Sequence, residues 1–119
     1  MVSVGIKTKS IYDEGTPGEG FRLLVMRRWP RGIRKTRIDE WDRDLSPSLG
    51  LLNDWIKKKI HFKEFKKRYV NEMRGSLQRQ KIQLLAERAE KETIILLCHE
   101  EEDTYCHRKM LKELIDKCR

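Results

Sequence analysis

The chain has 119 residues, a length that fits one domain with a modest hydrophobic core. Apolar residues make up 38% of it and charged residues 39%, and no run approaches the ~18 apolar residues of a membrane helix. The opening segment MVSVGIKTKS has neither the apolar stretch nor the cleavage site of a signal peptide. We therefore expect a cytoplasmic protein that makes no membrane contact.

The formal net charge of +8 favours anionic partners such as nucleic acid, nucleotides or phosphorylated metabolites, although it also serves solubility. Lys, Arg and Glu dominate the charged residues while Gln and Asn are scarce, a composition typical of thermophiles. Cysteines of intracellular proteins are usually reduced, but proteins of hyperthermophiles are an exception. A disulfide between Cys98 and Cys106 therefore stays open as an alternative.

Three segments have the apolar patterns of β-strands. Residues 2–7 alternate apolar with small or polar side chains. Residues 21–26 are almost continuously apolar, as in a strand buried on both faces, and we expect this strand to end near Trp29 because Pro30 cannot donate to a ladder. Residues 93–97 are β-branched and aliphatic and too short for a typical helix, so they are predicted to form the core strand.

Helical periodicity dominates the middle and the end of the chain. Ser46 as N-cap and Pro47 in the first turn predict a helix start, and Gly75 is expected to break the helical pattern. The apolar stripes before this break are Leu49, Leu52, Trp55, Ile56, Ile60, then Phe62, Phe65, Tyr69 and Met73. The stripe directly after Gly75 is Leu77, Leu84, Leu85 and Ala89. A final helix, capped by Asp103 or Thr104, is predicted to bury Cys106, Met110, Leu111, Leu114, Ile115 and Cys118.

The order strand, strand, helices, strand, helix defines the fold class. A strand, a helical crossover and a second strand imply parallel pairing through a right-handed connection. The sequence therefore predicts an α/β protein: a small layered sandwich with a short, mainly parallel sheet flanked by helices, similar to a Rossmann fold. In open α/β sheets, ligands bind outside the carboxyl ends of the strands.

A basic turn follows the second predicted strand. Residues 27–37 contain six positive side chains and no acid. Arg27 and Arg31 can bind phosphate or carboxylate bidentately, Trp29 offers a face for stacking, and Gly32 permits a tight turn. The segment predicts a pocket for a small anion or nucleotide, or a nucleic-acid surface. The alternative is that these cations pair with the acids that follow, Asp39, Glu40, Asp42 and Asp44.

A second cluster lies where the third predicted strand ends and the last helix begins. Cys98 at the strand end and Cys106 in the first helical turn are candidate nucleophiles or redox centres, because helix N-terminal amides favour a thiolate. His107 is the candidate acid or base, and Arg108 a candidate anion ligand. The alternative is structural, since cysteines often pack as small apolar residues.

Two kinds of site, a cysteine phosphatase site and a zinc site, fit this second cluster poorly. A cysteine phosphatase would place an arginine six positions after Cys98, where Thr104 stands, and the acids at 100–103 would repel an anion. A zinc site could draw on Cys98, His99, Cys106 and His107, but their spacing matches no common zinc motif, so we predict no metal. No cofactor and no oligomeric state is assigned from the sequence.

The motifs RRWPRGIRKT and DEWDRDLSPS, with CHR after the last strand, resemble the domain-of-unknown-function family 488, which includes the YeaO-like bacterial proteins. The similarity covers nearly the whole chain. The resemblance implies a compact single-domain α/β fold and a shared site, but no particular reaction. It carries over Arg27, Trp29, Pro30, Arg31, Gly32, Trp41, Ser46, Pro47, Cys98, Glu100, Cys106, His107 and Arg108 as motif residues.

We therefore predict one cleft between the turn at 27–32 and the loop at 98–108, which binds a small anionic ligand. The predicted ligand-binding residues are Arg27, Trp29, Arg31, Gly32, Glu100 and Arg108, and the catalytic candidates are Cys98, Cys106 and His107. The alternatives are a nucleic-acid-binding protein without catalysis that uses residues 27–37, and a redox-sensing or structural protein with the disulfide.

Overall fold

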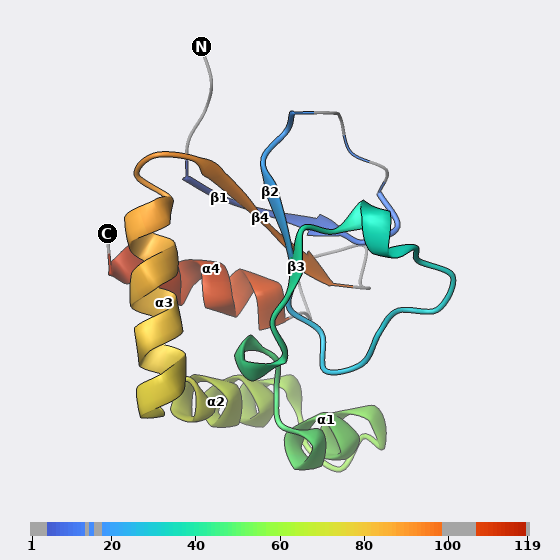
Figure 1. The fold of residues 1–119 in the computed structure, drawn as a ribbon. Coiled ribbons are helices and arrows are strands. Elements are labelled where there is room, and N and C mark those ends of the chain that lie inside the picture. The colour runs from blue at the N-terminus through green and yellow to red at the C-terminus, as the bar shows by residue number, and fades with distance from the viewer. Residues whose placement is uncertain (1–4, 14, 16–17, 99–106, 119) are drawn as a thin grey trace.

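A parallel sheet with the strand order β1-β4-β2-β3 organises the molecule (Figure 1). The structure, a computed structural model, describes residues 5–13, 15, 18–98 and 107–118. The strands are β1 (Gly5–Ser10), β2 (Phe21–Leu24), β3 (Glu40–Trp41) and β4 (Thr93–Cys98). The central strand β4 pairs with β1 on one side and β2 on the other. The predicted small layered α/β sandwich with a short parallel sheet is confirmed.

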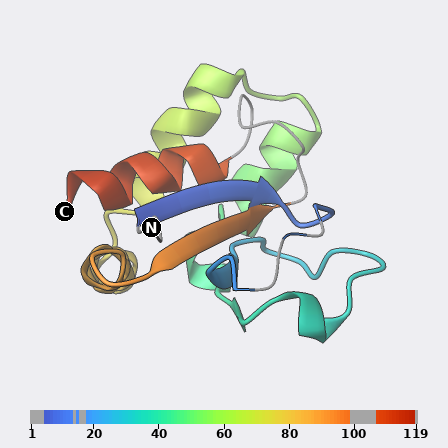
Figure 2. The same cartoon turned by 90° about the horizontal axis from the view of Figure 1, so that it is seen from above.

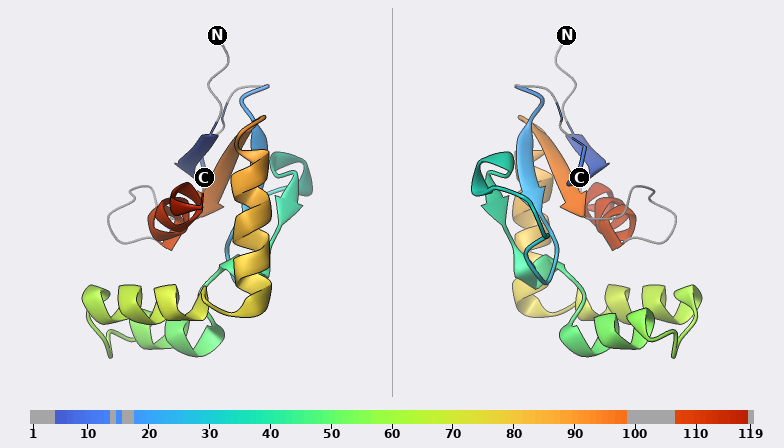
Figure 3. Two further views of the ribbon diagram at one scale, coloured as in Figure 1. Left: turned by 90° about the vertical axis from the view of Figure 1, so that its left-hand side faces the viewer. Right: turned by 90° about the vertical axis from the view of Figure 1, so that its right-hand side faces the viewer.

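The helices are α1 (Leu49–Ile56), α2 (Phe62–Glu72), α3 (Ser76–Arg88) and α4 (His107–Lys117). Two short 3₁₀ turns, Lys35–Arg37 and Arg43–Leu45, flank β3. Helix α4 runs alongside β1 (Figure 2), and α1 and α2 lie together below the carboxyl ends of the strands (Figure 3). None of the described helices is long and apolar enough to cross a membrane.

The two faces of β4 have different covers, because successive strand side chains point to opposite sides. Ile94 and Leu96 belong to the larger core cluster, to which all four helices contribute. Ile95 and Leu97 belong to a smaller cluster that is covered by side chains from the irregular segment at 26–41. Helices therefore pack on one face of the sheet, and a folded loop with tryptophans packs on the other.

The strand boundaries differ from the predicted ones at their ends. Strand β2 ends at Leu24 rather than near Trp29, although the amide of Val25 still donates to the Leu97 carbonyl over 3.0 Å. Beyond it, the indole nitrogens of Trp29 and Trp41 donate to backbone carbonyls and fold the chain back onto the sheet. Strand β1 covers Gly5–Ser10, and residues 2–4 of the predicted strand lie outside the described residues.

The start of α1 also differs from the prediction. Ser48, not Ser46, is the N-cap, and its hydroxyl oxygen accepts from the amide of Leu51 over 3.3 Å. Ser46 is buried, and its hydroxyl donates to the carbonyl of Arg43. The carboxylate of Glu72 on α2 accepts from the Ser48 amide over 2.8 Å, so a tertiary contact fixes this cap.

The predicted apolar stripes are partly wrong about which side chains are buried. In α1, Leu51 is buried while Leu49 and Ile56 are exposed. In α3, the exposed side chains include Leu77 and Leu84, because Ile82, Leu85, Ala86 and Ala89 form the buried face. In α4, Met110, Leu111 and Ile115 are buried as predicted, whereas Cys118 is exposed. The predicted caps Asp103 and Thr104 lie outside the described residues.

Candidate functional site

A cavity of about 620 Å³ opens where the carboxyl ends of β2 and β4 meet α1 and the start of α4. Its lining combines the turn after β2 with Cys98 at the end of β4 and His107 at the start of α4. Parallel strands bring their carboxyl ends to the same edge of the sheet, which is why these distant segments meet. The cavity thus joins residues of both clusters that the sequence singles out.

The rim of the cavity is positively charged. Arg27, Arg28, Arg31 and Lys58 line it, and no acidic side chain does so among the described residues. Arg27 Nε donates to the carbonyl of Pro47 over 3.0 Å, which anchors this side chain beside α1. Arg28 and Arg31 are exposed. This arrangement leaves guanidinium donors at the mouth of an otherwise largely apolar cavity.

One wall of the cavity is Trp29, whose position depends on Trp41. The two rings meet edge to face with centroids 5.3 Å apart. Trp29 Nε1 donates to the carbonyl of Ile33 over 2.8 Å, and Trp41 Nε1 donates to the carbonyl of Met26 over 2.7 Å. Gly32 has φ +79, so it supplies the left-handed turn between these anchors and does not itself line the cavity.

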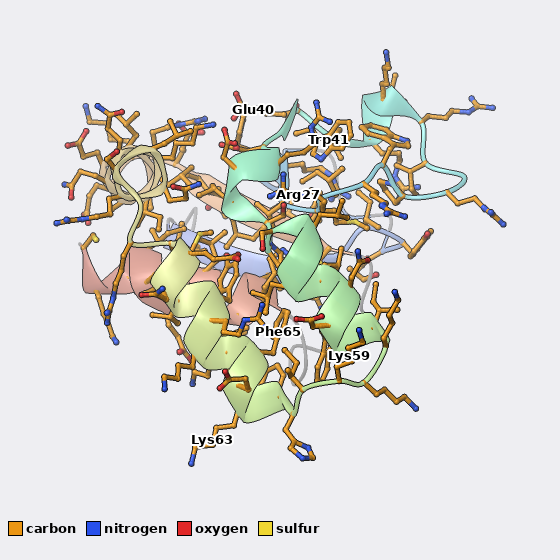
Figure 4. All side chains as sticks on the ribbon, turned by 90° about the horizontal axis from the view of Figure 1, so that it is seen from below. Arg27, Glu40, Trp41, Lys59, Lys63 and Phe65 are labelled. Atoms are coloured by element: carbon orange, nitrogen blue, oxygen red, sulfur yellow. The ribbon has the colours of Figure 1, made fainter. Side chains whose placement is uncertain are left out.

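Side chains of α1 and α2 also line the cavity, among them Phe65 (Figure 4). Trp55 and Phe65 line it, with ring centroids 5.2 Å apart, and Lys58 lies where α1 gives way to α2. Lys58 adopts a φ of 58, which turns the chain between the two helices. Trp55 and Phe65 belong to the predicted apolar stripes of the helices and are not among the predicted site residues. Helical spacing gives no indication of which apolar side chains border a cavity.

Cys98 and His107 form a pair at the base of the cavity. Cys98 Sγ lies 3.9 Å from His107 Nδ1, and both residues are buried. The other ring nitrogen, Nε2, lies 2.5 Å from the carbonyl oxygen of Val25, just past β2. A carbonyl oxygen can only accept, so Nε2 carries a proton in this contact. In the neutral ring, Nδ1 then presents its lone pair toward the thiol.

Arg108 does not lie on the cavity, in contrast to its predicted ligand-binding position. It is 1% exposed, and its Nη1 donates to the carbonyls of Lys9 (3.0 Å) and Cys98 (3.3 Å). The guanidinium therefore joins the ends of β1 and β4 to α4. Of the other predicted site residues, Glu100 and Cys106 lie outside the described residues, as does the proposed disulfide partner of Cys98.

The acids at 39–44 are the alternative partners of the basic turn, and one of them, Asp44, interacts electrostatically with Arg27. Lys81 Nζ donates to Asp42 (3.0 Å) and Asp44 (2.8 Å). The hydrogen bond from Lys81 lowers the pKa of Asp44, and the bond to Asp44 raises the pKa of Lys81. Asp39 accepts from the backbone amide of Arg22 over 2.8 Å. The direct hydrogen bonds of these acids are thus to α3 and β2, and Asp44 in addition interacts with the charge of Arg27.

The basic segment at 27–37 does not form one uniform surface. Arg37 Nη2 donates to the carbonyls of Ile11 (3.1 Å) and Asp13 (3.2 Å), so it ties this segment to the end of β1. Arg34 and Lys35 are exposed and do not line the cavity.

A zinc site can be assessed only in part, because two of its four candidate ligands, His99 and Cys106, lie outside the described residues. Among the described residues, no three His, Cys, Asp or Glu side chains gather as metal ligands.

Comparison with known proteins identifies the family. A family model described as "Active DUF488-N3 subclade" matches residues 6–119. The Escherichia coli (strain K12) protein "Uncharacterized protein YeaO" is 33% identical over 112 residues, which cover 92% of this chain and 96% of YeaO. No solved structure matches the chain.

Mycobacterial relatives match over a shorter stretch. "Uncharacterized protein Mb3100c" of Mycobacterium bovis and "Uncharacterized protein Rv3073c" of Mycobacterium tuberculosis are each 36% identical over 73 residues. The aligned stretch covers 60% of this chain and 62% of each of theirs, so less than two thirds of these relatives is matched. The family model, in contrast, covers almost the entire sequence, and the relation to YeaO spans nearly all of both proteins. The chain therefore belongs to the DUF488 family and is similar to its member YeaO.

Proposed function

We propose that the cavity binds a small anionic ligand, a nucleotide or another phosphorylated compound, and that Cys98 reacts with this ligand as a nucleophile. One observation carries the proposal: three arginines and the Cys98–His107 pair line the same cavity. Arginine forks bind phosphate and carboxylate oxygens, and a cysteine beside a histidine is a common arrangement for covalent catalysis.

The size and the walls of the cavity support a ligand with a flat ring. Small-molecule sites usually have volumes of roughly 300–1,000 Å³, and this cavity has about 620 Å³. Trp29 and Trp55 both line the cavity and offer aromatic surface, while Arg28 and Arg31, which also line it, are exposed. A nucleotide fits this combination, with its base against the aromatic side chains and its phosphates on the arginines.

The Cys98–His107 geometry supports a proton transfer that activates the thiol. The thiol proton passes to His107 Nδ1, and the sulfur electron pair forms a bond to the electrophilic atom of the ligand. The leaving group departs with its bonding pair and takes the proton from His107. The separation of 3.9 Å is long for a strong hydrogen bond, and we expect it to shorten when ligand fills the cavity.

Thermal shift with phosphorylated compounds tests the binding step. We would screen inorganic phosphate, nucleoside mono- and diphosphates and sugar phosphates against the native protein and Arg31→Ala. A ligand at 100 times its Kd stabilises by about 2.7 kcal/mol, and Arg31→Ala should lose most of this gain. Arg34→Ala is the matched control, because Arg34 is an exposed arginine of the same segment that does not line the cavity.

The result that contradicts binding in the cavity is a ligand-induced shift that is unchanged in Arg31→Ala, or one that Arg34→Ala loses equally. The first would place the ligand elsewhere. The second would indicate a general effect of positive charge. Binding of nucleic acid along residues 27–37 and a disulfide between Cys98 and Cys106 stay predictions.

A further inference from the structure

The outer side of α2 carries a second concentration of positive charge, separate from the cavity. A shallow groove of about 610 Å³ follows this helix, and its lining includes Lys63, Lys66, Lys67, Arg68 and Arg74 but only one acid, Glu64. We refer to these residues as the α2 groove. Lys57, Lys58 and Lys59 precede it in the turn from α1 and are all exposed.

Most of this charge is not neutralised within the protein. Arg68 Nη1 pairs with Asp54 over 2.9 Å, and the carboxylate of Glu72 is used by Ser48. Across the residues that the structure describes, no ion pair joins Lys63, Lys67 or Arg74 to a carboxylate. The groove therefore presents cations that a polyanion can neutralise.

The spacing of these cations fits a linear polyanion. Lys63 and Lys67 are four residues apart and so lie on the same side of α2, about 6 Å from each other along the axis. The helix itself has 11 residues and is about 16 Å long, and Arg74 follows just beyond its C-cap, Met73. Since the phosphates of a nucleic-acid strand are spaced by about 3.4 Å along a duplex axis, this line spans several of them.

The composition of the groove favours nucleic acid over a membrane or a protein as its partner. The apolar side of α2, with Phe65 and Tyr69, is buried in the core, and only Val70 adds an apolar side chain to the groove. A membrane-bound helix needs an exposed apolar face, and a protein interface usually has aromatic anchors at its centre. Nucleic acid needs neither, because contacts to phosphates supply most of its non-specific affinity.

We propose that the α2 groove docks the phosphate backbone of a nucleic acid. Figure 4 shows Lys63 extending away from the protein body, whereas Phe65 points toward the cavity side of the same helix. The two sites thus lie on different sides of α2. The docking proposal does not depend on the ligand or the chemistry of the cavity.

Fluorescence anisotropy with labelled mixed-sequence DNA and RNA oligonucleotides, single- and double-stranded, tests this proposal over a series of salt concentrations. The double variant Lys63→Glu/Lys67→Glu should weaken binding by at least tenfold at low salt. The slope of log affinity against log salt should fall in magnitude by about 1.4 for single strands and about 1.8 for duplex DNA, because each of the two lost phosphate contacts removes about 0.7 or 0.9. The matched control is Arg79→Glu/Lys91→Glu on the α3 side, where two exposed cations undergo the same change of charge.

The expected result is a loss in the α2 double variant alone, with circular dichroism and thermal unfolding close to native for both variants. Equal losses in both variants would overturn the proposal, since net charge alone would then explain binding. It would also be overturned by native affinity in the α2 variant while Arg34→Glu/Lys35→Glu loses binding, or by binding to anionic phospholipid vesicles without any binding to nucleic acid.

Discussion

The turn at 27–32 and the start of α4 both lie at the carboxyl edge of the sheet and both carry arginine, but their arginines have different surroundings. Arg28 and Arg31 are exposed at the mouth of the cavity. Arg108 is 1% exposed and donates to the carbonyls of Lys9 and Cys98. A guanidinium can satisfy its donors with an external anion or with internal carbonyls. Burial decides between the two roles.

The start of α4 and the turn at 27–32 also differ in how rigidly their side chains are held. The start of α4 is fixed by buried contacts: His107 to the Val25 carbonyl and Arg108 to two strand ends. The turn is held by hydrogen bonds from the indoles of Trp29 and Trp41, from Arg27 Nε to the Pro47 carbonyl and from the Tyr12 hydroxyl to the Arg31 carbonyl. The side chains of Arg28 and Arg31, in contrast, are exposed. If the proposed function holds, the start of α4 provides a preorganised Cys98–His107 pair, and the turn provides side chains that can adjust to a ligand.

The largest effect is expected when the buried arginine is removed. Arg108→Ala leaves the carbonyls of Lys9 and Cys98 without this donor and creates a void, so it should lower the free energy of unfolding by about 3 kcal/mol. Urea denaturation measures this loss. The control Lys109→Ala, at the exposed neighbouring position, should change stability by less than about 0.5 kcal/mol. A native-like stability together with a lost ligand shift would instead assign Arg108 to ligand binding.

An intermediate effect is expected on the reactivity of Cys98. In a Cys106→Ser/Cys118→Ser background, Cys98 is the remaining thiol, and its alkylation by iodoacetamide can be followed by mass spectrometry. His107→Gln should slow alkylation about tenfold, because it removes the acceptor that faces Sγ. His61→Gln is the control, since His61 is exposed at the start of α2. Equal rates in all three proteins would make Cys98 a packing residue.

The smallest effect is expected at the support of the turn. Trp41→Phe removes the indole donor to the Met26 carbonyl and should cost about 1 kcal/mol. Because Trp41 contacts Trp29, the ligand-induced thermal shift should also decrease. Tyr69→Phe is a useful comparison: it loses a hydroxyl donor to the Leu45 carbonyl, so stability should fall similarly. A ligand shift reduced equally in both variants would argue that the turn has no special role.

The features that the sequence predicts correctly are those for which a residue pattern allows only one structural arrangement. Residues 93–97 have no polar side chain to expose after Thr93, so a central strand follows. The meeting of Cys98 with the turn after β2 also follows, because parallel strands share a carboxyl edge. The site residues themselves stay predictions, to be tested by the variants above.

The remaining features depend on contacts that local sequence does not encode. Two serines flank Pro47, and the choice of Ser48 as cap is linked to Glu72, which is distant in sequence. The burial of Ile82 instead of Leu84 in α3 depends on how this helix is rotated against the core. Likewise, the exposure of Arg31 and the burial of Arg108 cannot be read from residue type, since both follow strand ends in charged segments.

The position of β4 between β1 and β2 constrains the order of events during synthesis. Gly5 pairs in register with Thr93, and Phe21 with Ile94. Neither β1 nor β2 can therefore pair with β4 until Thr93–Cys98, in the last quarter of the chain, has been synthesised. Before that, β2 has only the two-residue strand β3 beside it. Such long sequence separations slow folding and leave strand edges open. The α1–α2 hairpin depends on local contacts, so it can form before β4 has been synthesised.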